Sequence, residues 1–410
     1  MIRRGLRLGR SVALYAITPA LSAAAPLMVI PAVTSRFGAD GWASVATGLS
    51  LGLVAAVVGE LGWAIVGPQA VAHDVDGAAR LYDQALAART CVVLPLAVVV
   101  AALSACVVPV HADAAAWVAA GVALGAVSPS WYFVGLARPV LILLTETLPR
   151  IVLLAAAAAG IARGGPLALY GAALTVAAVA AVALGGRAGG VRVFPTRSAF
   201  RRVPRTLREQ WVITTGRAIS SLYKAVPTTV VALVTPDLIA IWAALDRPLR
   251  MGLQVLAALP QRLQTWIARG ERSDMRRRVA LTIALNSGLG MVAGCAFAVV
   301  MPMVAPFLFS GSIHLPPRLC WLAALLIFVI CTGRGFGLVM VARRRAGATS
   351  AAALVSAGVG LPGVALAVGP VGVDGALIAL VLAEVAGIAL QWIVLRRESA
   401  TSLRKGRLSW

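Results

Sequence analysis

The chain has 410 residues, of which 60% are hydrophobic and 13% charged, and its formal net charge is +22. This composition excludes a soluble enzyme of the same length, whose surface would need far more charge, and it indicates a polytopic membrane protein. The positive charge does not require a nucleic-acid partner, because the cytoplasmic loops of membrane proteins accumulate arginine and lysine.

Runs of about 20 apolar residues between charged loops predict twelve membrane-spanning helices and an all-α fold. The first run follows a basic, signal-like N-terminus but continues to about Val33, long enough to remain as a helix. The expected spans are 12–35, 42–66, 86–109, 115–136, 140–161, 166–186, 211–234, 238–260, 279–308, 318–341, 348–369 and 372–395.

The two halves of the chain resemble each other. Trp117-Val118-Ala119-Ala120 matches Trp321-Leu322-Ala323-Ala324, and Gly165-Pro166 matches Gly369-Pro370 at the same offset. This offset corresponds to six helices, so the repeats keep one orientation and are expected to form two lobes related by a pseudo-two-fold axis along the membrane normal. The expected parts are an N-terminal six-helix lobe, a basic cytoplasmic linker, a C-terminal six-helix lobe and a basic cytoplasmic tail, at 1–186, 187–210, 211–395 and 396–410.

Arginine and lysine collect in alternate loops. One side holds those of the N-terminus, Arg80, Arg89, Arg138, the segments 187–208, 262–278 and 343–345, and the C-terminal tail. The opposite loops hold only Arg36, Arg163 and Arg318. This imbalance predicts that both termini lie in the cytoplasm and that the chain is a multi-pass protein of the plasma (inner) membrane.

Several cations nevertheless lie inside apolar spans. Arg217 and Lys224 share one helix face, and Arg247 and Arg250 are i, i+3 neighbours on the next span. A cation near the middle of a bilayer costs roughly 2.5–3.5 kcal/mol on insertion scales, so these side chains are not expected to face lipid. They predict a positively charged cavity that binds an anion; the alternative is that they form structural pairs with acids on other helices.

Four acids are also expected within spans. Glu146 with Arg150 and Asp246 with Arg250 have i, i+4 spacing and are expected to pair. Glu60 and Glu384 remain as candidate coupling sites for a proton or a sodium ion, the alternative again being a structural role.

The sequence shows no catalytic constellation. The five cysteines have no metal-ligand spacing, and the glycines around Arg334 lie in an apolar helix without a preceding strand, unlike a phosphate-binding loop. A nucleophile with its base is also lacking. We therefore expect no enzyme activity, no cofactor and no metal.

An ordered set of motifs carries a resemblance that extends over nearly the whole chain: PAVTSRFGADGWASVATG, VGELGWAIVGPQAVA, SPSWYFVGLARP, DLIAIWAALDRPLRMGLQVLAALPQRLQTWIAR, MPMVAPFLFSG and GPVGVDGALIALVLAE. With them the chain resembles the polysaccharide (O-antigen, Wzx-type) flippases of the multidrug/oligosaccharidyl-lipid/polysaccharide exporter superfamily. The resemblance implies two lobes facing across a cationic cavity and transport of polyprenyl-diphosphate-linked oligosaccharide to the outer leaflet for cell-envelope polysaccharide synthesis. Its implied partners are this lipid-linked glycan, membrane lipids and other polysaccharide assembly proteins.

The cations and the resemblance together predict the substrate contacts, because arginine can hold diphosphate oxygens bidentately. Arg36 is expected at the outer mouth. The predicted substrate-binding residues are Arg217, Lys224, Arg247, Arg250 and Arg334.

Other readings stay open. A cation-coupled multidrug exporter of the same superfamily would bind organic cations with cavity acids, and a peptidoglycan-precursor flippase would usually have two further helices. A membrane glycosyltransferase would need a sizeable outer loop with a catalytic acid or base. A non-transporting scaffold of a glycan assembly pathway would give the embedded cations no role.

Overall fold

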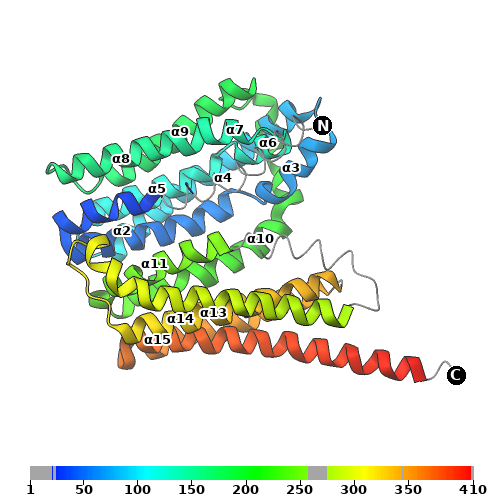
Figure 1. The fold of residues 1–410 in the computed structure, drawn as a ribbon. Helices are drawn as coiled ribbons and strands as arrows, with labels where there is room; N and C mark the ends of the chain where they lie inside the picture. The colour runs from blue at the N-terminus through cyan, green and yellow to red at the C-terminus, as the bar shows by residue number, and fades with distance from the viewer. Residues whose placement is uncertain (1–20, 22–24, 257–274, 344, 408–410) are drawn as a thin grey trace, which may run out of the picture. The chain divides into compact units, whose positions relative to one another are not determined.

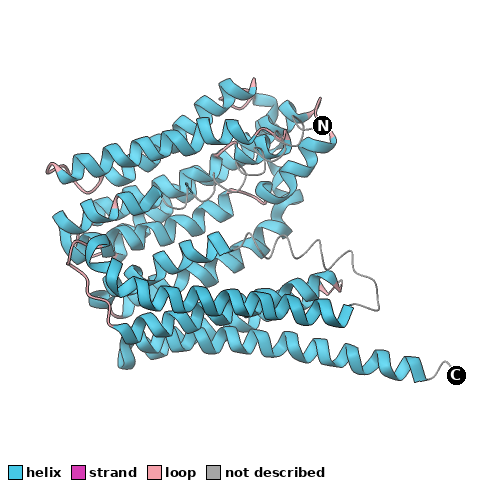
Figure 2. Ribbon diagram, viewed as in Figure 1, coloured by secondary structure: helices cyan, strands magenta, loops and turns pink. Residues whose placement is uncertain are grey.

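A computed structural model describes residues 21, 25–256, 275–343 and 345–407, and its regular elements over this range are all helices (Figure 2). Eight described stretches are long and apolar enough to cross a membrane. The two longest, Ile30–His73 and Gly347–Arg397, have 44 and 51 residues, about twice the ~20 residues that one crossing needs. Each of these two is interrupted by a glycine of positive φ, Gly38 or Gly372.

The break at Gly372 divides α15 (Ala346–Arg407) into a helical hairpin (Figure 1). A Cβ at Gly363 would lie 3.1 Å from the Cβ of Ala379, and one at Gly375 would lie 2.6 Å from the carbonyl oxygen of Ala367. Residues before Gly372 therefore pack against residues after it. The predicted spans 348–369 and 372–395 are the two arms of this hairpin.

The chain divides into two compact units, Met1–Leu233 with Phe307–Ile313, and Val234–Pro306 with His314–Trp410. We call them unit 1 and unit 2. The lobe boundaries expected from the sequence stay a prediction.

Unit 1 is built around α5, which packs between α2 and α9 through small residues. A Cβ at Gly52 of α2 would lie 2.6 Å from the carbonyl oxygen of Ala119, and one at Gly171 of α9 would lie 2.3 Å from the backbone of Trp117. Such glycines let apolar helices approach closely within a membrane. The helices of unit 1 are η1 (Ala25–Met28), α2 (Ile30–Gly59), α3 (Trp63–His73), α4 (Ala78–Val107), α5 (Ala112–Leu124), η2 (Gly125–Val127), α6 (Ser130–Gly135), α7 (Pro139–Ile142), the π-helical η3 (Leu143–Thr147), α8 (Leu148–Ala162), α9 (Leu169–Gly189) and nearly all of α10 (Arg197–Val234).

Unit 2 uses the same kind of contact, since a Cβ at Gly294 of α13 would lie 2.6 Å from the carbonyl oxygen of Ala324 in α14. Its helices are η4 (Pro236–Leu238), α11 (Ile239–Leu256), α13 (Met275–Leu308, except its last two residues), α14 (Pro317–Ala342) and α15.

Two helix starts differ from the sequence-based expectation. α10 begins at Arg197, so the second half of the expected linker is helical and continuous with the predicted span 211–234. α4 begins at Ala78, well before the predicted span start at 86. The placement of Arg89 among loop cations was therefore wrong, because Arg89 lies inside α4 and is only 3% exposed.

Candidate functional site

Three helical segments of unit 1 are interrupted at polar residues. The first break follows α2, where Leu61 and Gly62 both have positive φ before α3 begins at Trp63. Glu60 is the capping residue of α2 and lies directly at this break. Broken helices at membrane depth are tolerated where their backbone is buried in protein or lines a polar cavity.

The second break lies between α5 and α6, at Ser128 and Pro129. Arg89 of α4 stabilises it by donating to the carbonyl oxygens of Ala126 and Ser128, the latter at 2.9 Å. These carbonyls lack helical partners because the helix stops here, and the guanidinium satisfies them.

The third irregularity is the π-helical segment η3, which carries Glu146. π-Bulges within α-helices are frequent at functional sites. The Glu146 carboxylate accepts a hydrogen bond from the hydroxyl of Ser128, and the Ser128 hydroxyl oxygen also accepts the backbone N–H of Ser130 at 3.1 Å. The second and third irregularities are thus joined through one serine.

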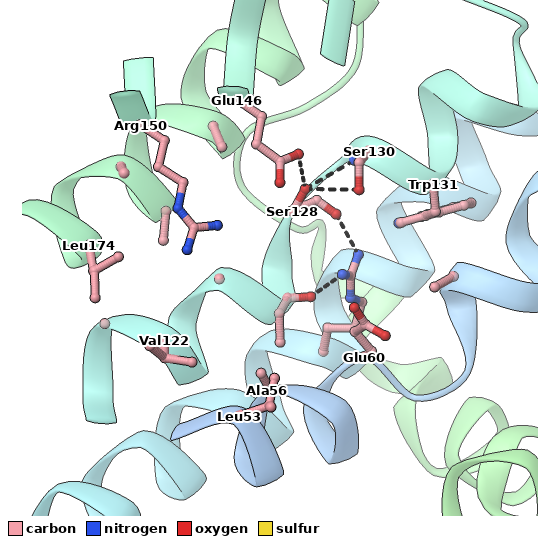
Figure 3. A pocket seen from close by; sticks show the side chains of 18 residues that line it. Leu53, Ala56, Glu60, Val122, Ser128, Ser130, Trp131, Glu146, Arg150 and Leu174 are labelled. Carbon is pink, nitrogen blue, oxygen red and sulfur yellow. Dashed lines mark hydrogen bonds between the residues drawn. The ribbon is translucent and has the colours of Figure 1, made fainter. Parts of the chain in front are cut away.

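A cavity of about 270 Å³ lies among these three irregularities (Figure 3). Glu146 points toward Ser128, whereas Arg150 enters the cavity separately and its Nε has no hydrogen-bond partner among the described atoms. The expected Glu146–Arg150 ion pair was therefore wrong, and Ser128 is the partner of Glu146. The charged residues that line the cavity are Glu60, Arg89, Glu146 and Arg150.

Glu60 and Arg217 form an ion pair that connects the break after α2 to α10. Their side chains are 31% and 26% exposed. Glu60 thus has a cationic partner, as the structural alternative for this acid requires. Arg217 has an acidic partner in return, so it contributes less net positive charge than the sequence implied.

A second group of predicted residues lies in unit 2, on and beside α11. Arg250 donates from Nε to the carboxylate of Asp246 at 2.7 Å, which confirms the pair expected from their spacing. The two side chains are 25% and 8% exposed, so the pair is largely buried. Arg334 of α14 donates to the carbonyl oxygen of Leu253, one turn after Arg250 on α11. Arg247 lies on the same helix and is half-buried.

The remaining predicted residues are placed as follows. Lys224 belongs to α10, but its side chain lies outside the described residues. Glu384 of α15 lies close to α14, since a Cβ at Gly333 would be 3.9 Å from its Oε2. Arg36 is exposed, and its guanidinium lies near Gly164. Because the predicted substrate contacts fall in both units, a single shared cavity for them stays a prediction.

The site residues missed from the sequence are Arg89, Ser128 and Ser130, whereas Arg150 was expected only as the partner of Glu146. The break at the serines could have been predicted from the sequence, because Pro129 disfavours the helical conformation at Ser128, the residue before it. The site of Arg89 could not be found in this way, since its partners are main-chain carbonyls of a break more than thirty residues away.

No family model and no curated protein sequence matches the chain. Several solved structures share its fold. An inward-facing multidrug resistance MATE family transporter of the MOP superfamily has a TM-score of 0.70 at 14% identity, covering 92% of this chain and 95% of its own. A MOP superfamily transporter from Pyrococcus furiosus, described by a reverse polarity of its binding pocket, has a TM-score of 0.62 at 13% identity. The match covers 95% of this chain and 96% of that transporter. The eukaryotic MATE transporter AtDTX14 has a TM-score of 0.60 at 12% identity, and the match again covers 95% of this chain and 96% of the other.

These likenesses confirm the predicted fold class, an all-α polytopic membrane protein with the two-lobe, twelve-helix architecture of MATE transporters. The identities are too low to carry a substrate from those proteins to this chain.

Proposed function

We propose that the chain is a transporter that moves polyprenyl-diphosphate-linked oligosaccharide from the inner to the outer leaflet by alternating access, for cell-envelope polysaccharide synthesis. The fold that it shares with transporters supports a transport function. A transporter of this kind requires no enzyme activity. The lipid-linked substrate rests on the charges of unit 2 and on the sequence motifs of the polysaccharide flippases.

The observation that carries the substrate class is the placement of two guanidinium groups on one stretch of α11. Arg250 lies on this helix and is bonded to Asp246, and Arg334 reaches the carbonyl oxygen of Leu253 one turn further on. A lipid diphosphate has more than one negative charge and would accept hydrogen bonds from both groups. The Asp246 contact also orients Arg250, leaving its terminal nitrogens as donors for a phosphate oxygen.

A multidrug exporter is the second candidate, favoured by one observation in unit 1. Glu60 and Glu146 both line the cavity there, and an organic cation would seek such acids. Arg89 and Arg150 line the same cavity, however, so that its formal charges balance. The anionic substrate fits unit 2 better than a cation fits unit 1. A scaffold without transport would leave the charges of both places unexplained.

The test is leaflet translocation of a radiolabelled polyprenyl-diphosphate oligosaccharide in proteoliposomes. Arg247→Ala, Arg250→Ala and Arg334→Ala are each expected to lower the rate about 10- to 100-fold, as the loss of a charged hydrogen bond of ~1.5–3 kcal/mol implies. Arg318→Ala is the control, because Arg318 is 74% exposed and pairs with Asp374 at 3.3 Å. Equal rates in wild type and all three variants would contradict the proposed contacts.

A further inference from the structure

Unit 2 contains an apolar groove next to the α11 cations. The groove has a volume of about 410 Å³, within the range of ~300–1,000 Å³ typical of ligand pockets. Every residue that lines it is apolar, and three helices, α11, α13 and α14, contribute. The lining residues are Leu249, Gly252, Leu253, Val255, Leu256, Ala293, Ala296, Phe297, Val300 and Ile327.

The groove and the guanidinium groups are continuous along α11. Leu249 lines the groove and directly precedes Arg250, which Asp246 holds in place. Leu253 lines it as well, and its carbonyl oxygen accepts the hydrogen bond of Arg334. A molecule that fills the groove would therefore meet a cationic group at the edge of the groove. From there it would extend along about two turns of α11.

We propose that this groove holds the hydrocarbon chain of the transported lipid while the neighbouring arginines hold its diphosphate; this rests on the proposed function. An anionic head joined to a long apolar tail matches both halves of the surface. Burial of the tail gains little energy in a bilayer, because the surrounding lipid is equally apolar. The groove instead orients the tail, so that the head is presented to Arg250 and Arg334.

Gly252 provides a way to fill the groove without disturbing the fold. A Cβ at this position would meet nothing within 4 Å, so a leucine side chain can project into the groove. Leucine is also a better helix former than glycine, which is about 0.8–1.0 kcal/mol less favourable than alanine, so Gly252→Leu should fold. Gly288 of α13 is a matched control, because a Cβ there also meets nothing within 4 Å and Gly288 does not line the groove.

The experiment uses the full chain in liposomes with a farnesyl diphosphate analogue carrying a diazirine at the end of its tail, and mass spectrometry locates the label. We expect labelling of α11 and α13 lining residues that unlabelled farnesyl diphosphate reduces at least fivefold, while farnesol and phosphatidylglycerol do not. Gly252→Leu should reduce the labelling at least fivefold, whereas Gly288→Leu should label like wild type.

Labelling that Gly252→Leu leaves unchanged, or that phosphatidylglycerol competes away equally well, would overturn the inference, because ordinary bilayer lipid would then occupy the groove. Translocation separates this inference from the proposed function. If wild type labels as expected but moves no lipid-linked oligosaccharide, the proposed function fails and the groove stands. If wild type and Gly252→Leu translocate equally, the groove fails and the function stands.

Discussion

Arg89 is almost fully buried in unit 1, at 3% exposure, and donates to the backbone carbonyls of Ala126 and Ser128. Without it, both carbonyls at the break between α5 and α6 would lose a charged donor. We expect Arg89→Gln to lower the free energy of unfolding by about 1.5–3 kcal/mol, the range for a lost hydrogen bond to a charged group. Thermal unfolding in detergent measures this.

The control for Arg89→Gln is Arg205→Gln, because the Arg205 side chain is 84% exposed in its ion pair with Glu209. Exposed pairs contribute ~0–1 kcal/mol, so this variant should unfold near the wild-type temperature. Equal thermal shifts in both variants would show that Arg89 does not stabilise the break.

Glu146 differs from the other embedded acids in its partner. Among the described residues no cation lies within ion-pair distance of its carboxylate, which accepts the Ser128 hydroxyl instead. A carboxylate at membrane depth that lacks a cationic contact can carry a proton. We expect Glu146→Gln to abolish stimulation of translocation by an imposed proton gradient, measured in proteoliposomes, and to leave the expression level unchanged.

Glu209→Gln is the control for Glu146, because Glu209 is 58% exposed on α10. It should keep the full response to the gradient. A Glu146→Gln variant that responds as strongly as wild type would rule this acid out as the proton carrier.

The helical hairpin of α15 depends on Gly372, whose φ of 71° and ψ of −151° fall in a region that is essentially restricted to glycine. A side chain there is strained whatever space surrounds it. We expect Gly372→Ala to destabilise the protein by about 1–3 kcal/mol, seen as a lower unfolding temperature. Gly358→Ala on the same helix is the control; its φ is ordinary and a Cβ there meets nothing within 4 Å, so it should be neutral or stabilising.

Hydropathy placed most of the spans but not the features that make the cavity. The ends of α9 and α14 agree with the predicted spans 166–186 and 318–341 within a few residues, because apolar run length alone determines them. The break at Glu60 and the π-helical segment at Glu146 do not interrupt the apolar runs, so periodicity could not reveal them. They depend on distant partners, Arg217 and Ser128.

The partners of the site cations could be predicted only where both residues lie on one helix. The Asp246–Arg250 pair followed from i, i+4 spacing on one helix. The Glu60–Arg217 pair joins segments 157 residues apart, which no local pattern can show. Sequence therefore identified several of the embedded charges, but not Arg89, whereas the structure was needed to show which of them have partners.

At the scale of the whole molecule, the shared fold and the embedded charges bear on different parts of the proposed function. Among the proteins that share the fold are multidrug resistance transporters. Around α11, in contrast, the guanidinium groups of Arg250 and Arg334 both contact this helix. The proposed function uses the charge around α11 to choose an anionic substrate, which the shared fold alone does not assign.

The most direct measurement compares the two substrate classes in one preparation of proteoliposomes. Translocation of a polyprenyl-diphosphate oligosaccharide and uptake of a cationic dye such as ethidium are followed in wild type and Arg250→Ala. The proposed function predicts that wild type moves the lipid-linked glycan and not the dye, and that Arg250→Ala moves the glycan about 10- to 100-fold more slowly. Uptake of the dye without movement of the glycan would contradict it and identify a cation exporter instead.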